Sequence, residues 1–159
     1  MLQLQNDTWT IEINPDKGCW SAFPRQANGI RIQNARIQIQ IKTIEKKERI
    51  LDGPWLPLSG DERQVVSSRH GSMERAHLEF STLSGRVKAG LDFVLPAEGP
   101  LFMWRASLRN LDDLPIFVDQ IDLLRAGGQS SQGRVILPAG PAARATFYSN
   151  GWQSWSRSG

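Results

Sequence analysis

The stretch Ile30-Arg-Ile-Gln-Asn-Ala-Arg-Ile-Gln-Ile-Gln-Ile-Lys-Thr-Ile44 is the longest strand pattern in the chain and decides its fold class. Its first isoleucines, Ile30 and Ile32, occupy even positions, whereas those at 37, 39 and 41 occupy odd positions. Because side chains of a strand alternate between its two faces, a change of parity predicts a bulge or short turn, here near residues 33–35. We therefore expect two strand segments, each with one apolar face and one solvated face.

Shorter apolar stretches with the same alternation fill the rest of the chain and are separated by turn residues. Asn14-Pro15-Asp16-Lys17-Gly18 is typical of a turn that ends a strand, and Leu83-Ser84-Gly85 is typical of a hairpin loop. No segment shows a 3.6-residue apolar period, so the pattern predicts an all-β, antiparallel β-sandwich. The other expected strands are residues 9–13, 19–23, 64–68, 74–82, 86–95, 101–109, 116–124, 134–137 and 144–148, with Trp104, Ala106, Ile116 and Val118 expected in the core.

Length and charge restrict the function further. A chain of 159 residues suits one domain, residues 1–159, and a formal charge of +3 without a basic stripe does not favour a nucleic-acid partner. The single cysteine, Cys19, excludes an intramolecular disulfide and is expected to be a buried thiol. The first residues have no secretory pattern and no window approaches a membrane span, which favours a cytoplasmic protein without a membrane partner.

The most informative motif lies in Phe147-Tyr148-Ser149-Asn150-Gly151-Trp152-Gln153-Ser154-Trp155-Ser156. The Asn-Gly pair tolerates positive φ and predicts a chain reversal. In an irregular turn, Trp152 and Trp155 would lie on the same side, and with the Gln153 amide they would form an amphipathic platform. Such a platform suits a sugar, whose C–H face stacks on an indole while its hydroxyls bind amides.

Residues 150–156 resemble the Trp-Gln-Ser-Trp signature of the α-galactosidases of glycoside hydrolase family 36. The resemblance implies the N-terminal β-sandwich domain of that family, supersandwich-like, directly ahead of a catalytic barrel. It also implies that Trp155, with Gln153 and Trp152 beside it, lies at the entrance of a site for an α-galactoside that is formed mostly by the barrel. The alternative interpretation is that both tryptophans close the core of the sandwich.

A second aromatic lies on the Pro-rich loop Gly53-Pro54-Trp55-Leu56-Pro57-Leu58. Trp55 on such a loop is a candidate secondary sugar contact, because the prolines hold the indole in place. The competing interpretation is that Trp55 and Leu58 cover the core.

The chain itself shows no catalytic pattern. A retaining glycosidase needs two carboxyls about 5–5.5 Å apart, and the Asp112-Asp113 pair lies in a turn before Pro115, where Asp is favoured because it binds local backbone amides. His70 and His77 have no convincing partner in the sequence, and no metal or cofactor site is expected. In the resembled family both carboxyls come from the barrel, so we expect this chain to be inactive alone and to be an N-terminal piece of a longer, retaining α-galactosidase.

Three functions remain open from the sequence. In the first, the domain packs on its own catalytic barrel, contributes an aromatic to the sugar site and helps subunits to associate as a homo-oligomer. In the second, it is an independent carbohydrate-binding module. In the third, it is a structural or oligomerisation domain. A transglycosylase related to the hydrolases would carry the same domain.

Overall fold

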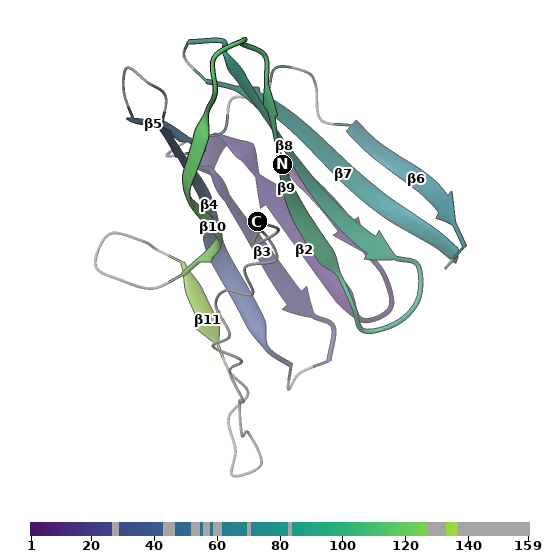
Figure 1. Ribbon diagram of the computed structural model, residues 1–159. Coiled ribbons are helices and arrows are strands. Elements are labelled where there is room, and N and C mark those ends of the chain that lie inside the picture. Colours follow the sequence, from purple (N-terminus) through teal and green to yellow (C-terminus); the bar gives the residue numbers. More distant parts are fainter. Residues whose placement is uncertain are drawn as a thin grey trace, which may run out of the picture.

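The protein forms two antiparallel sheets that pack face to face (Figure 1). The computed structural model describes residues 1–26, 29–42, 47–51, 55, 58, 62–69, 71–82, 84–126 and 133–136. The strands are β1 (Leu2–Gln5), β2 (Trp9–Asn14), β3 (Cys19–Pro24), β4 (Arg31–Lys42), β5 (Lys47–Ile50), β6 (Glu62–Ser68), β7 (Gly71–Ser81), β8 (Val87–Pro96), β9 (Met103–Asn110), β10 (Phe117–Arg125) and β11 (Arg134–Ile136).

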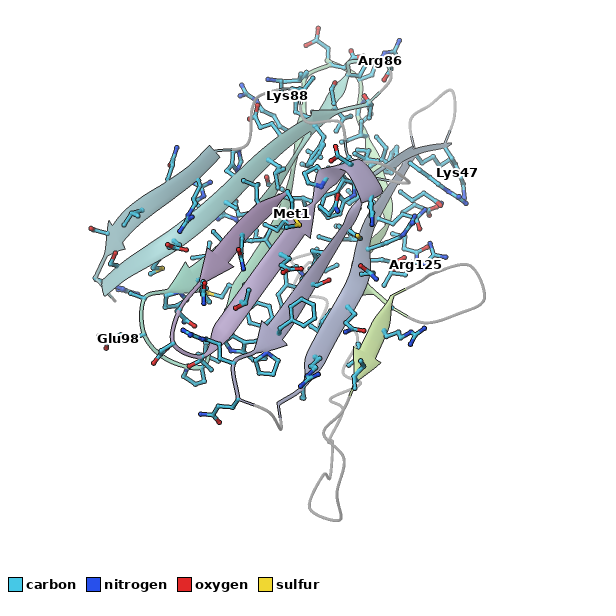
Figure 2. All side chains as sticks on the ribbon, turned by 180° about the vertical axis from the view of Figure 1, so that it is seen from behind. Met1, Lys47, Arg86, Lys88, Glu98 and Arg125 are labelled. Atoms are coloured by element: carbon cyan, nitrogen blue, oxygen red, sulfur yellow. The ribbon has the colours of Figure 1, made fainter. Side chains whose placement is uncertain are left out.

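The first sheet has the strand order β1-β2-β3-β4-β10, and β5 and β11 also pair with β4. The second sheet has the order β6-β7-β8-β9. All of these pairs are antiparallel, which confirms the predicted all-β sandwich. Strand β6 lies at the outer edge of the second sheet, away from the first sheet in both views (Figures 1 and 2).

The change of parity in β4 is confirmed and is located at Asn34. Ile32 is buried on one side of this residue, and buried positions resume at Ala35 with the opposite parity. Asn34 has a φ of 50°, the left-handed conformation that accommodates an extra residue in a strand. Its backbone N–H donates to the Ser21 hydroxyl at 2.9 Å. Strand β4 is therefore one continuous strand with a bulge at Asn34, whereas the sequence predicts two separate segments.

The core between the sheets is centred on Trp20 of β3, which is fully buried. Its indole lies 5.5 Å from the Phe93 ring of β8 and 5.1 Å from the Trp104 ring of β9, measured between ring centroids. Phe102 completes the group at 6.2 Å. These aromatic contacts join the two sheets and contribute beyond the area that they bury.

Both predicted turns have the expected chemistry. Residues Pro15–Lys17 form one 3₁₀ turn, in which the Asn14 side chain accepts from the Lys17 N–H at 3.1 Å. Gly18 follows in the left-handed conformation that ends such a turn. In the hairpin between β7 and β8, the Thr82 N–H donates to the Val87 carbonyl at 2.9 Å.

Other sequence predictions differ from the structure in part. Cys19 is buried, as predicted, and Trp104, Ala106 and Ile116 pack against the core. Val118, predicted to lie there, is 48% exposed, because it lies on an edge strand of the first sheet. Strands β1 and β5 are not among the predicted strands, and the predicted strand 144–148 lies outside the described residues.

We expect Asn34→Val to lower the free energy of unfolding by about 1–2 kcal/mol, because a β-branched residue is strained at positive φ. Asn34→Gly should be tolerated, since glycine adopts this conformation freely. Urea unfolding measures both. Gln33→Val, at the preceding position of the same strand, is the control and should stay within about 0.5 kcal/mol. Equal losses at 33 and 34 would contradict a strained bulge at Asn34.

Candidate functional site

A charged row crosses the outer face of the second sheet. Residues of β7 to β9 that face away from the core alternate with buried ones, and the hairpin registers bring His77 opposite Asp92 and Asp92 opposite Arg105. Arg75, two residues before His77, faces the same side. The antiparallel pairing therefore gathers four polar groups from three strands, with one carboxylate at their centre.

Asp92 is the centre of this group, with a side chain that is only 2% exposed. Its Oδ1 accepts from Arg75 Nε at 2.8 Å and Nη2 at 2.5 Å. Its Oδ2 accepts from Arg105 Nε at 3.0 Å and Nη2 at 2.6 Å. His77 Nδ1 lies 2.7 Å from Oδ1, and we assign it as the donor because an ionised carboxylate only accepts.

The surroundings of Asp92 favour its charged form. Burial by itself raises the pKa of the carboxyl, but hydrogen bonds from Arg105, Arg75 and His77 outweigh it and hold the pKa below its usual range. The carboxylate is thus ionised at neutral pH, and it is shielded from solvent by its partners.

Beside this row lies a cavity of about 350 Å³ on the same face. Its apolar lining includes side chains from all four strands of the sheet, and its polar lining comes from the charged row. The lining residues are Val66, Met73, Arg75, Asp92, Val94, Met103, Trp104 and Arg105.

Of the candidate sugar-binding residues, the structure describes only Trp55. Trp152, Gln153 and Trp155 lie outside the described residues. Trp55 is 1% exposed and packs edge-on against Phe80, with ring centroids 6.2 Å apart. Its backbone N–H donates to the Pro15 carbonyl at 2.7 Å. A sugar contact would require this indole to leave the core, so the structure agrees with the interpretation that Trp55 covers the core. Leu58, which the same interpretation placed over the core, is exposed instead.

The structure also shows the partners of two further polar residues, Asp112 and His77. The Asp112 carboxylate accepts from the Leu114 N–H at 3.3 Å, which confirms its role in the local turn, and it pairs with Arg86 at 3.1 Å. The prediction that His77 has no partner was wrong, because Asp92 lies directly across the hairpin. His70 lies outside the described residues.

In the described part of the chain, no group of three or more His, Cys, Asp or Glu side chains could hold a metal ion. Within the same residues, no helix has the length and apolar character needed to cross a membrane.

Comparisons with protein families, with curated proteins and with solved structures found no match to this chain.

Sequence reasoning missed the group around Asp92. A partial signal was present, because Asp92 interrupts the apolar stretch from Leu91 to Leu95 and a hairpin loop is predicted at 83–85. A loop of those three residues would place His77 opposite Leu91, whereas in the structure Thr82 bonds to Val87 and the register brings His77 opposite Asp92. The position of Arg105 depends on a second, longer connection between β8 and β9.

We expect Asp92→Asn to lower the free energy of unfolding by on the order of 3 kcal/mol, because it leaves Arg75 and Arg105 without the carboxylate between them. It should also flatten the acid dependence of stability. The folded pKa of Asp92 is lowered, so its contribution is present above the unfolded value of about 4 and is lost as the pH falls through the folded pKa.

Thermal unfolding between pH 7 and pH 2 measures both effects. Asp113→Asn, at an exposed position, is the matched control and should stay within about 0.5 kcal/mol of the original protein. If Asp92→Asn keeps the full loss of stability in acid, the carboxylate does not stabilise the sheet through its two arginines.

Proposed function

We propose that this chain is the non-catalytic N-terminal domain of an α-galactosidase-like glycoside hydrolase. In this proposal the domain packs on the catalytic barrel of that enzyme, and Trp155, with Gln153 and Trp152, contributes to the rim of the α-galactoside site. The location is cytoplasmic, which the single buried thiol of Cys19 supports. The observation that carries the packing role is an exposed apolar strand.

Strand β10 presents apolar side chains to solvent along its length. We call the β10 apolar strip the residues Phe117, Val118, Ile121, Leu123 and Leu124, all of which are exposed. Phe117 is 59% exposed. Val118 and Ile121 pair with Ile41 and Ile39 of β4, which are fully buried, but themselves stay about half exposed. Phe117 and Val118 are successive residues with no bulge between them, so they point to opposite sides of the sheet and β10 is apolar on both sides. Exposed apolar residues on an edge strand suit contact with another protein part.

Strand β11 follows the β10 apolar strip along β4. Strand β10 ends opposite Arg36 of β4, and β11 begins opposite Gln33, so the two strands follow each other along β4 (Figure 1). Val135 and Ile136 of β11 are exposed as well. Among the described strands none pairs with the other edge of β10. An apolar strip with an unpaired edge suits a domain interface.

The state of the carboxylates supports a non-catalytic role. Asp92, the most buried of them, is enclosed by two arginines and a histidine. Glu74 pairs with Arg63 at 2.5 Å, and Asp119 pairs with Lys47 at 3.1 Å. Lys47, the partner of Asp119, lies on the side of the molecule where β4, β5 and β10 meet (Figure 2). In the proposed enzyme both catalytic carboxyls come from the barrel.

The alternative functions make different use of the same residues. An independent carbohydrate-binding module would use Trp55, Trp152 and Trp155 as its platform, and the burial of Trp55 disfavours that arrangement. A purely structural or oligomerisation domain would use the β10 apolar strip to bind a second copy. Barrel binding and galactoside hydrolysis are the two measurements that separate these alternatives from the proposal.

The interface is tested by Phe117→Ser combined with Leu124→Ser. Because both side chains are already exposed, the isolated domain should keep its stability within about 1 kcal/mol. Binding to the separately produced barrel should weaken about tenfold or more, as measured by calorimetry. Leu101→Ser, at a residue that is 72% exposed and outside the strip, is the control. If the double variant binds the barrel as tightly as the original domain does, or if it loses self-association instead of barrel binding, the strip is not a barrel interface.

The activity is tested with a chromogenic α-galactoside. The full-length protein should hydrolyse it, and residues 1–159 alone should not. Trp155→Ala in the full-length protein should lower kcat/KM by about tenfold or more while leaving the fold intact. Galactose binding by residues 1–159 alone would favour the carbohydrate-binding module, and a Trp155 variant that loses stability with normal kinetics would favour a structural domain.

A further inference from the structure

The outer face of the second sheet places an apolar band directly beside the charged row. Val66 pairs with Met73 across β6 and β7, and Val94 pairs with Met103 across β8 and β9. All four side chains line the cavity, although they lie on the solvent side of the sheet. Met103 is 51% exposed. A sandwich usually has polar side chains on this side, so the band is unexpected for a surface without a ligand.

The polar wall of the cavity has an excess of positive charge. Two guanidinium groups, from Arg75 and Arg105, share the one carboxylate of Asp92. The two guanidinium groups and the one carboxylate have a summed charge of +1. The single negative charge of Asp92 balances only one of the two guanidinium groups, so a second anion would be attracted to this wall.

Both arginines also retain donors that Asp92 does not use. Each guanidinium has five N–H donors, and the contacts with Asp92 involve Nε and Nη2 in both cases. Among the described residues, no hydrogen bond involves either Nη1 group, which leaves both for another acceptor. The Arg105 side chain is 69% exposed, so a ligand can reach it from solvent.

We propose that this cavity binds a small amphipathic monocarboxylate. Its carboxylate lies against Arg75 and Arg105, and its hydrocarbon part lies over Val66, Met73, Val94 and Met103. The cavity volume of about 350 Å³ is within the range of small-ligand sites, which are mostly apolar with a few placed polar groups. Asp92 acts as a positioning residue, because it holds both guanidinium groups beside the apolar band.

The lining separates this ligand from a sugar. A neutral sugar needs amide or hydroxyl partners, and the lining residues that the structure describes include no Asn, Gln, Ser, Thr or Tyr side chain. The inference is thus independent of the proposed α-galactoside site, which uses Trp155 and its neighbours.

Calorimetric titration with octanoate tests the proposal, with octanol as the uncharged analogue of the same length. We expect octanoate to bind and octanol to bind at least about tenfold more weakly, because it lacks the charge that the arginines recognise. Equal binding of the two, or no binding of octanoate at millimolar concentration, would overturn the proposal. Acetate tests the apolar half and should bind about tenfold more weakly than octanoate.

Variants assign the binding to this cavity. Arg105→Gln and Met103→Gln should each weaken octanoate binding about tenfold, through the polar and the apolar wall respectively. Arg109→Gln is the matched control, since Arg109 lies on the same strand and face but outside the lining. Met103 is exposed, so its variant keeps the test decisive if Arg105→Gln loses its fold. Binding that survives both cavity variants would refute the site.

Discussion

The change of side-chain parity at Asn34 is the constraint on which the first sheet depends. Strand β3 pairs with β4 on both sides of this residue, at Ile32 and at Ala35, whereas β11 pairs only before it and β5 and β10 only beyond it. One strand thereby organises four neighbours while keeping Ile32, Ile37 and Ile39 in the same core. Without the left-handed residue, one half of the strand would present its isoleucines to solvent. The close approach of Gly133 to the Asn34 carbonyl shows how tightly the neighbouring strand follows this irregularity.

Much of the fold could be predicted because its signals are local. Alternating apolar residues located most strands, and the Asn14–Gly18 and Leu83–Gly85 segments supplied the turns. The prediction failed where position in the sheet decides burial. Val118 has the same alternation as a core residue, but it lies on an edge strand and stays half exposed. The sequence pattern contains no information on which strands end at an edge.

The site was less predictable than the fold, because it depends on register across three strands. His77 and Asp92 are fifteen positions apart and meet through one hairpin, whose register differs by one residue from the one that the predicted loop at 83–85 implies. Arg105 joins through a longer connection whose length does not fix the register, and the apolar band around Met103 lies on a face where alternation predicts polar residues. The motif around Trp155 is the reverse case, because it can be recognised in the sequence but its residues lie outside the described residues.

The pairing of β10 with β4 has a consequence for how the chain acquires its structure. Phe117 lies opposite Lys42, so β4 lacks one neighbour until a segment 75 positions further along has been synthesised, the difference between 117 and 42. Contacts between such distant segments slow folding, because a large loop must close before they form. On the ribosome, the hairpins β2–β3 and β7–β8 can assemble early from near neighbours. Among the described strands, β10 and β11 are synthesised last, so the edge of β4 that they cover stays unpaired in the nascent chain until then and is open to wrong pairing.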